Sequence, residues 1–470
     1  MTFTLRPYQV EISDAISNNT RGIVQSPTGT GKTISQIDTI KCEFEVGNNV
    51  MVLLPTLKLI TQTISVFDRH LREYDFIPVE VSSSGKPRFR KPFGDPKRDR
   101  PPIKATNNPQ DLSDICEKYP TTSVIFFSTY HSSLSVIDSG VPLGCCLFDE
   151  AHNSTQEDFF KKVQKIVKVA ERNYFFTATP IYGPQYSSSN ASFDGYVEYD
   201  GSGMDNVDVY GEMLVKVSYT EMFKEGYLIK PTFDVLYVDA EEEEDMFDVN
   251  HHTVQKLIEL DSQMEGVNHK MLVCLSGNKC LKNINTNKSL IEYCNSMGYI
   301  VLTTSSDDGF KINGVSSNLD AVDEIRRLGA IVDQNMIVFH INQLAEGIDV
   351  PALDHVIFDR KTVGPVYALQ SIGRVERTDE ATNKKSAKVT IIERSTDTTN
   401  IRNGIKDLMK YLLASGYPKD IEIGNSKYDG VFKDVIEDIE NEEERKARDI
   451  AIQFRLNELM NADDYSKFAF

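Results

Sequence analysis

Short apolar runs recur through the first 180 residues of the chain, and each is followed by a stretch with helical spacing. The runs are apolar at successive positions and end in small or polar residues, which is typical of strands buried on both faces of a parallel sheet. In such sheets ligands bind where strands end and loops begin. The runs are RGIVQSP (21–27), NVMVLLPT (49–56), TSVIFFSTY (122–130), GCCLFDEAH (144–152) and NYFFTATP (173–180).

The same pattern restarts after a Ser/Gly/Asn/Asp-rich piece (187–206), a connecting strand (231–239) and an acidic run, DAEEEED. We therefore predict two tandem α/β domains, over residues 1–230 and 231–395. Residues 396–470 are highly charged and predict a small helical C-terminal extension. The second set of runs comprises KMLVCLSG (270–277), YIVLTTSS (299–306), NMIVFHIN (335–342), DHVIFDR (354–360) and KVTIIER (388–394).

The segment VQSPTGTGKT (24–33) lies between a predicted strand and a predicted helix, where a phosphate-binding loop belongs. Gly29 and Gly31 permit a tight turn of the backbone around an anion. Lys32 would neutralise charge on the β- and γ-phosphates, and the Thr33 hydroxyl would ligate Mg²⁺. Ser26 stands where the usual pattern has glycine, so the loop departs from the written rule at that one position.

Two adjacent acids follow a buried run at DEAH (149–152). Nucleoside triphosphate hydrolysis needs one carboxylate for Mg²⁺ and another to orient the attacking water. We assign these roles to Asp149 and Glu150, respectively. A surface acidic pair opening a helix is the alternative, which the phosphate loop upstream makes less favourable.

These segments together resemble the superfamily 2 helicases and translocases. DEAH follows SPTGTGKT and precedes TATP (177–180), and members of this family commonly carry a small residue where Ser26 stands. Further segments match in order: LRPYQ (5–9), LLPTLKL (53–59), FFSTYHS (126–132), LAEGIDVP (344–351), through Glu346, Gly347 and Asp349, and QSIGRVERT (370–378), through Gln370, Gly373, Arg374 and Arg377.

The resemblance implies two RecA-like parallel-sheet domains that bind ATP and Mg²⁺ and act on nucleic acid. The ATP-binding residues it implies are Arg6, Gln9, Pro27, Thr28, Gly29, Thr30, Gly31, Lys32, Thr33, Gly347 and Asp349, with Thr33 and Asp149 on the metal. The nucleic-acid-binding residues are Pro55, Thr56, Thr129 and Tyr130, and the residues coupling the two sites are Thr177 and Thr179. The catalytic residues are Lys32, Asp149, Glu150, His152, Gln370, Arg374 and Arg377.

Arg374 and Arg377 are three residues apart, so on a helix they would project from one face. We expect them to reach ATP only when the two domains close, because they belong to the second domain. An arginine supplied in this way contributes ~10³–10⁵ in rate to phosphoryl transfer.

Charge limits how this chain can hold a polyanion. The net charge is −19, which argues against coating nucleic acid over the whole surface. Residues 86–104, in contrast, contain eight Lys or Arg and two Asp, with Phe89 and Phe93 among them. This basic segment has the composition of a nucleic-acid arm, although a solvated loop is equally compatible with it.

The remaining composition indicates a cytoplasmic protein, or a host-intracellular one if the chain is viral. No apolar run is long enough to span a membrane, no signal peptide is recognisable, and the seven cysteines show no zinc spacing. We interpret the cysteines as reduced, mostly buried thiols. We expect a monomer in isolation.

The leading hypothesis is an ATP-dependent DNA helicase or translocase. The RPYQ, TYHS and EGIDVP forms are similar to restriction motor subunits, phage UvsW-type helicases and related viral helicases, and His152 distinguishes the chain from DEAD-box RNA chaperones. One alternative is the motor subunit of a multi-chain restriction complex, whose nuclease or methylase would be another chain. A second is an ATP-gated DNA remodeller that does not separate strands.

Overall fold

The computed structural model describes residues 4–83, 105–182, 202–238, 251–264, 269–275, 277–341, 344, 350–359 and 365–393, with 405–406, 408–410, 412–413, 415–424, 432–439 and 441. The chain divides into two compact units. Unit 1 comprises Met1–Leu228 and Leu344–Asp349, and unit 2 comprises Ile229–Gln343 and Val350–Phe470. The domain limits at residues 230 and 395 remain predictions.

Unit 1 is built on a seven-stranded sheet in its described part, in the order β3-β4-β2-β5-β6-β1-β7. Every pair of neighbouring strands in it is parallel. The strands are β1 (Arg21–Gln25), β2 (Val50–Leu54), β3 (Phe76–Val81), β4 (Ser123–Thr129), β5 (Cys145–Phe148), β6 (Arg172–Thr177) and β7 (Met213–Lys216).

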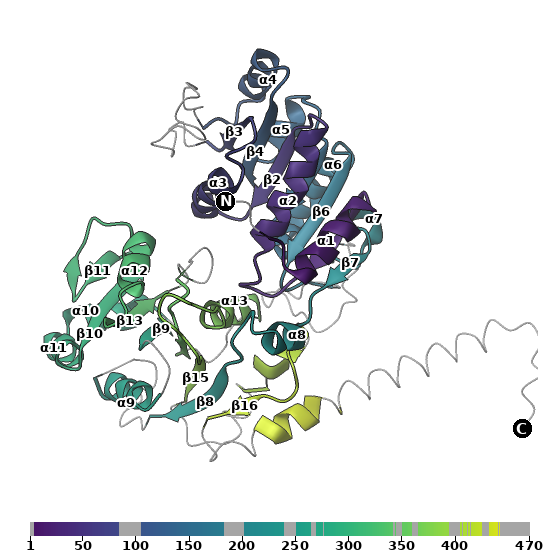
Figure 1. Cartoon of the computed structure of the whole chain (residues 1–470). Helices are drawn as coiled ribbons and strands as arrows, with labels where there is room; N and C mark the ends of the chain where they lie inside the picture. Colours follow the sequence, from purple (N-terminus) through teal and green to yellow (C-terminus); the bar gives the residue numbers. More distant parts are fainter. Residues whose placement is uncertain are drawn as a thin grey trace, which may run out of the picture. The chain divides into compact units, whose positions relative to one another are not determined.

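Helices cover both faces of this sheet (Figure 1). The helices are α1 (Pro7–Ser17), α2 (Lys32–Glu45), α3 (Leu57–His70), α4 (Pro109–Lys118), α5 (Leu134–Asp138), α6 (Glu157–Ile166), α7 (Val207–Tyr210) and α8 (Tyr219–Lys224), with the 3-10 helix η1 (Ala151–Thr155). Leu112 of α4, Val136 of α5 and Ile166 of α6 join one core cluster. Phe127 points to the other face, where its ring lies 5.4 Å from that of Phe67 on α3.

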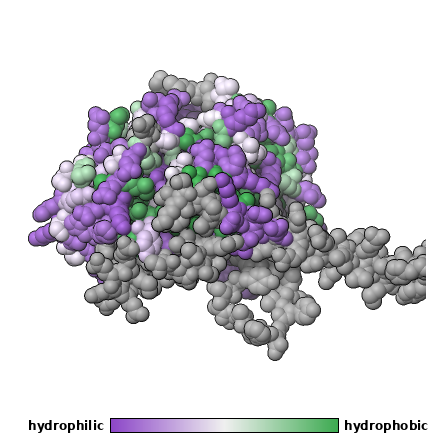
Figure 2. Space-filling model, turned by 90° about the horizontal axis from the view of Figure 1, so that it is seen from below, coloured by the Kyte–Doolittle hydropathy of each residue, from purple (hydrophilic) through white to green (hydrophobic). Residues whose placement is uncertain are grey.

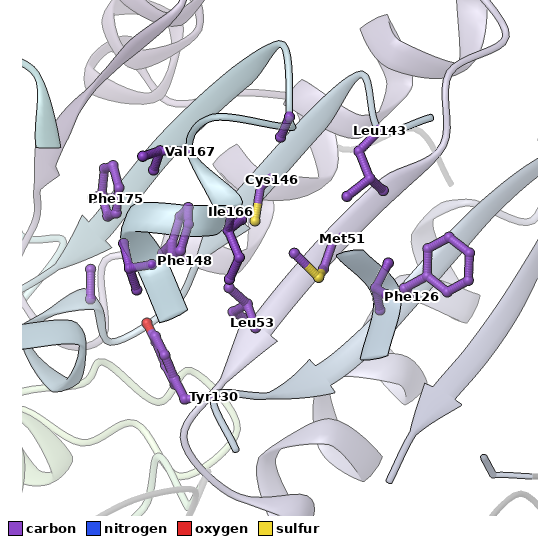
Figure 3. Packing of buried hydrophobic residues seen from close by; sticks show 14 of the residues in the cluster. Met51, Leu53, Phe126, Tyr130, Leu143, Cys146, Phe148, Ile166, Val167 and Phe175 are labelled. Atoms are coloured by element: carbon purple, nitrogen blue, oxygen red, sulfur yellow. The ribbon is translucent and has the colours of Figure 1, made fainter. Parts of the chain in front are cut away.

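The central strands of unit 1 are apolar at successive positions because both faces of the sheet are covered. All five residues of β2 are buried, and so are all four of β5. Figure 3 shows Met51, Leu53, Cys146 and Phe148 of these strands in one cluster. The Phe148 ring stacks on Phe175 with 4.2 Å between ring centroids.

Unit 2 is built on a nine-stranded sheet in its described part, in the order β12-β11-β10-β13-β9-β14-β15-β8-β16. The pairs β10–β11 and β11–β12 are antiparallel, and the others are parallel. The strands are β8 (Thr232–Tyr237), β9 (Lys270–Cys274), β10 (Tyr299–Ser305), β11 (Gly309–Ile312), β12 (Val315–Ser316), β13 (Asn335–His340), β14 (His355–Phe358), β15 (Lys388–Glu393) and β16 (Glu422–Ile423).

The helices of unit 2 are α9 (His251–Ser262), α10 (Asn278–Thr286), α11 (Lys288–Ser296), α12 (Ala321–Gly329) and α13 (Pro365–Val375). Residues of α9, α10 and α11 share one core with β9, β10 and β13. Residues 405–406, 408–410, 412–413 and 432–439 are helical as well.

The structure differs from the sequence prediction mainly at the sheet edges. The strand expected to connect the two domains is β8, which pairs with β15 inside the second sheet. The C-terminal region is not wholly helical, because β16 extends the same sheet beside β8. The strands β3, β7, β11 and β12 were not predicted, and all lie at or next to an edge of a sheet. Most residues of β7, β11 and β12 are at least partly exposed, which weakens the apolar pattern. The strand β3 is mostly buried, but Pro78 and Glu80 interrupt its apolar pattern.

A buried polar cluster lies within unit 2 around Asp261. Its carboxylate accepts a hydrogen bond from the Tyr299 hydroxyl at 2.6 Å and contacts Nδ1 of His269 at 2.9 Å and Nδ1 of His355 at 3.2 Å. Burial raises the pKa of Asp261, but the hydrogen bonds from His269, His355 and Tyr299 outweigh it and hold the pKa below its usual range. The hydrogen bond to Asp261 raises the pKa of His269.

His269→Gln should remove a pH-dependent part of the stability of unit 2. The folded-state pKa of His269 is raised, so its contribution is complete below the unfolded value of about 6.5 and is lost as pH rises through the folded value. The urea midpoint of the wild type should therefore exceed that of the variant most at about pH 6, and the gap should narrow by about pH 8. An equal gap at both pH values would contradict this.

The described residues contain no helix long and apolar enough to cross a membrane. Figure 2 shows one face on which hydrophilic residues predominate among the coloured ones. Five of the seven cysteines are buried, whereas Cys42 is exposed and Cys116 is partly exposed. Among the described residues no cluster of His, Cys, Asp and Glu has the arrangement of a metal cage.

Candidate nucleotide-binding site

The predicted phosphate loop joins the end of β1 to the start of α2. Gly29 and Gly31 have φ of 87° and 84°, in the left-handed region that glycine enters without steric cost. Helix α2 begins at Lys32, so the N–H groups of its first turn have no acceptor within the helix. These groups, with the positive end of the helix dipole, form an anion-binding site.

Ser26 has a structural role that glycine would not fill. Its side chain is buried, and its hydroxyl lies 2.6 Å from that of Thr30. The Thr30 hydroxyl donates to the carbonyl of Pro27 at 2.7 Å, so the proton between the two hydroxyls comes from Ser26. The Ser26 N–H donates to the carbonyl of Thr177 at 3.0 Å. Hydrogen bonds within the loop, and one from the loop to the end of β6, therefore fix its conformation.

The loop residues fit a triphosphate. Nζ of Lys32 donates to the Ser26 carbonyl at 3.3 Å, a contact that an ammonium group readily exchanges for phosphate. The Thr28 hydroxyl is buried and has no hydrogen-bond partner among the described residues. A bound anion would satisfy both groups, because buried polar atoms are rarely left unpaired.

The segment predicted to recognise adenine packs directly on the loop. Nε2 of Gln9 is 3.3 Å from the Thr30 carbonyl, and the Tyr8 hydroxyl donates to the same carbonyl. The Arg6 guanidinium lies over the ring of Tyr227, 4.5 Å from its centroid. The Tyr8 and Tyr227 rings meet edge to face at 5.5 Å. Sequence reasoning missed Tyr227, because nothing in its local pattern distinguishes it from a surface aromatic residue.

Asp149 lies at the end of β5, within reach of the phosphate loop's helix. Gln36 of α2 donates from Nε2 to Asp149 Oδ1 at 2.9 Å, and the Asp149 N–H donates to the Leu53 carbonyl. Burial, and after it the charge of Glu150, raise the pKa of Asp149 to about 7, although Lys32 acts in the opposite direction. Two adjacent carboxylates that disfavour each other's charge are the arrangement that a divalent cation relieves. Gln36 was not predicted.

Glu150 has an unusual backbone conformation, with φ 45° and ψ 53°. A non-glycine residue there costs about 1–3 kcal/mol and persists only where the surroundings fix it. Here the Glu150 carbonyl accepts hydrogen bonds from the backbone N–H and from Nδ2 of Asn153, both at 3.0 Å. The Glu150 side chain is 17% exposed, so water reaches it.

His152 is buried beneath these acids and joins two strand ends. Its Nδ1 is 3.0 Å from the Thr177 hydroxyl and 3.3 Å from that of Thr179. Its Nε2 faces Nδ2 of Asn153 at 3.3 Å, and that amide also donates to the Glu150 carbonyl. Nε2 is therefore the acceptor and Nδ1 carries the proton in the neutral ring. Burial lowers the pKa of His152, which favours this neutral form.

The four residues predicted to contact nucleic acid differ in exposure. Pro55 is half-buried and Thr56 is exposed at the end of β2, whereas Thr129 and Tyr130 are buried at the end of β4. The Tyr130 hydroxyl donates to the Asp149 carbonyl at 3.0 Å, and the ring lies in the core cluster shown in Figure 3. In this conformation Tyr130 presents no ring face to a base. Its hydroxyl instead holds the backbone of the acidic segment through the Asp149 carbonyl.

Thr56 also has a structural role as the N-cap residue of α3. The Leu59 N–H donates to its hydroxyl at 3.3 Å. Thr56→Ala should therefore lower the free energy of unfolding by about 1 kcal/mol, while Thr56→Ser retains the cap and most of the stability. Thermal or urea unfolding of the three proteins measures this. Equal stability of Thr56→Ala and the wild type would rule out the capping role.

The arginine motif lies at the C-terminal end of α13 in unit 2. Gln370 and Arg374 are buried on the helix, and Arg377 is partly exposed. The prediction that both arginines share a helix face is wrong, because α13 ends at Val375 and Arg377 follows it. Of the remaining predicted site residues, Gly347 and Asp349 lie outside the described residues, as do Glu346 and the basic segment 86–104.

Comparison with known proteins gives a family match for the part of the chain that contains the phosphate loop and the acidic segment. Residues 2–182 match the family described as "Type III restriction enzyme, res subunit". No curated protein sequence matches the chain.

Solved structures extend the comparison to both units. The chain is similar to the ATP-dependent Type ISP restriction-modification enzyme LlaBIII bound to DNA, with 18% identity, a TM-score of 0.65, and 99% of this chain and 35% of that chain covered. A nuclease-deletion mutant of the Type ISP enzyme LlaGI, in complex with a DNA substrate mimic, gives 17% identity, a TM-score of 0.61, and 98% and 34% coverage.

A putative HsdR subunit of a type I restriction enzyme from Vibrio vulnificus YJ016 matches with 14% identity and a TM-score of 0.52, over 89% of this chain and 67% of that fragment. These likenesses confirm the predicted fold, two tandem RecA-like α/β domains. The chain spans about a third of the length of the two Type ISP enzymes.

Proposed function

We propose that the chain is an ATP-driven motor that translocates on duplex DNA, of the kind found in restriction enzymes. The observation that carries this proposal is the placement of Lys32 after β1 and of Asp149 and Glu150 after β5, on either side of β6. Gln36, on the helix that Lys32 begins, donates a hydrogen bond to Asp149. The family match over residues 2–182 and the likeness of both units to DNA-bound restriction enzymes support it.

In this proposal the assigned site residues of unit 1 have separate roles in hydrolysis. The first-turn N–H groups of α2 and the Lys32 ammonium bind the β- and γ-phosphates, and Arg6 and Gln9 hold the adenine. Thr33 and Asp149 would hold Mg²⁺, which supplies charge neutralisation at the transferring phosphate. Glu150 takes the proton of the attacking water on its carboxylate.

In this proposal the hydrogen-bond network around His152 couples ATP hydrolysis to nucleic-acid binding. His152 contacts Thr177 and Thr179, and Thr177 contacts the loop through the Ser26 N–H. Oε2 of Glu150 lies 3.7 Å from Nδ1 of His152, so we propose that a change at this carboxylate affects the end of β6 and the loop after β1. We propose that Arg374 and Arg377 of unit 2 stabilise the negative charge that develops on the transferring phosphate in the transition state.

Strand separation is not part of this proposal. The protein should hydrolyse ATP faster with duplex DNA than with RNA or without nucleic acid, and it should displace a triplex-forming strand from a duplex track. A fork-unwinding assay distinguishes a duplex translocase from a strand-separating helicase. Fork opening without triplex displacement would favour the helicase. An ATPase rate indifferent to single-stranded, duplex and forked DNA and to RNA would refute both.

A further inference from the structure

The turn that follows α13 is held by contacts from three separate segments of unit 2. Val375 ends the helix, Glu376 follows it, and Arg377 comes next. Lys384 binds Val375, whereas Ile229 and Tyr417 bind Glu376. The turn is therefore fixed directly beside the arginine to which we assign a catalytic role.

Lys384 binds three carbonyls at once. Its buried Nζ donates to the carbonyls of Val375 at 2.6 Å, Leu353 at 2.5 Å and Pro351 at 3.1 Å. Val375 ends α13, and Pro351 and Leu353 directly follow the segment EGIDV in the chain. The ammonium group thus joins the end of α13 to the residues of unit 2 that come after the EGIDV segment.

Glu376 is the second anchor, and its carboxyl is fully buried. Its backbone carbonyl accepts the N–H of Ile229 at 2.7 Å, and its Oε1 accepts the hydroxyl of Tyr417 at 2.6 Å. Ile229 is the first residue of unit 2, and Tyr417 belongs to the C-terminal region. The Tyr417 ring packs edge to face on Phe233 of β8, which holds the hydroxyl in place.

Burying a lysine and a glutamate is expensive, and well-packed apolar residues at such sites are often as stable or more so. Burial raises the pKa of Glu376 to about 8 and lowers that of Lys384 to about 7, so both groups resist their charged forms. Directional hydrogen bonds are what these side chains provide and apolar ones do not. Their value here is a fixed geometry of the turn.

We propose that Lys384, Glu376 and Tyr417 are positioning residues that hold the Val375–Arg377 turn so that Arg377 acts in ATP hydrolysis, and that the C-terminal region thereby controls turnover. This inference rests on the proposed function. It predicts that disturbing Tyr417 slows hydrolysis without weakening ATP binding, because the assigned ATP-binding residues belong to unit 1 and Tyr417 belongs to unit 2.

Tyr417→Phe tests this in the full chain, with Tyr299→Phe as the matched control. Both tyrosines are buried, both belong to unit 2, and each donates to a buried carboxylate at 2.6 Å, Tyr299 to Asp261. Tyr417→Phe should lower the DNA-stimulated kcat by about 10-fold, the loss expected for a misaligned catalytic group, with KM for ATP unchanged. Tyr299→Phe should lower thermal stability only.

Hydrogen exchange provides a readout that does not depend on activity. Peptides covering residues 372–378 and 228–232 should exchange faster in Tyr417→Phe than in the wild type, and not in Tyr299→Phe, because the Ile229 N–H bond to Glu376 loosens. If Tyr417→Phe exchanges faster but the wild type hydrolyses no ATP, the positioning role of Tyr417 stands and the proposed function is refuted. Unchanged exchange, or equal kcat losses in both variants, would overturn the positioning role.

Lys384→Met and Glu376→Gln extend the test. Methionine fills the lysine stem without its donors, so kcat should fall and exchange over residues 372–378 should rise. Glutamine keeps the Oε1 acceptor for Tyr417, so Glu376→Gln should retain most of the activity. A loss in Glu376→Gln as large as that in Tyr417→Phe would contradict a hydrogen-bonding role for Oε1.

Discussion

Glu150→Gln should abolish ATP turnover while ATP still binds. The amide has the shape of the carboxylate but cannot accept a proton from water, and general-base catalysis contributes about 10²–10⁴ in rate. ATP affinity should persist, because the phosphate contacts come from α2 and Lys32, and the Glu150 carbonyl still accepts both bonds from Asn153. Single-turnover hydrolysis and equilibrium binding of a fluorescent ATP analogue measure the two effects separately.

A matched control for this variant is Glu157→Gln. Glu157 lies in the first turn of α6 and is exposed, where it pairs with Lys161. An exposed pair of this kind contributes little to stability. Turnover should stay at the wild-type rate in Glu157→Gln, and retained turnover in Glu150→Gln would remove Glu150 as the base.

Arg377→Ala should have a comparable effect from the second unit. If Arg377 stabilises charge on the transferring phosphate, its loss should lower kcat by roughly 10³–10⁵, with binding of ATP and of duplex DNA little changed. Arg377→Lys should not restore the rate, because an ammonium cannot make the planar, two-pronged contact of a guanidinium. Steady-state hydrolysis at saturating ATP and DNA measures both variants.

Arg326→Ala is the control for the arginine prediction. Arg326 is in the last turn of α12 and is exposed, in a surface pair with Asp323 at 3.1 Å. Its loss removes one positive charge from unit 2 without touching the arginine motif. A similar fall in kcat for Arg326→Ala and Arg377→Ala would mean that net charge, not a transition-state contact, explains the effect.

The fold and the local motifs of unit 1 could be predicted because their signals are local in sequence. A strand such as β2 is apolar at every position, and the loop that ends in Lys32 shows its glycines and its lysine within ten residues. Contacts between segments that are far apart leave no such trace. Gln36 meets Asp149 across 113 positions, and Tyr417 meets Glu376 across 41.

Residues with two compatible roles were the other source of difference. Thr56 fits a nucleic-acid strand-end motif and also caps α3, and the sequence does not show that its hydroxyl is already engaged. The motif resemblance assigned Tyr130 to nucleic acid, but a tyrosine at the end of a buried strand also suits the core, where its ring lies. Burial decides between such roles, and burial depends on the packing of distant helices.

The left-handed backbone of Glu150 has a consequence for how this chain tolerates substitution. Asparagine and glycine occupy that conformation more easily than glutamate does, so either would relieve local strain. Both would also remove the carboxylate. A screen for thermal stability alone would therefore select the inactive protein at position 150, and a screen for turnover would select the strained one. Selection for stability and selection for turnover therefore favour different residues at position 150.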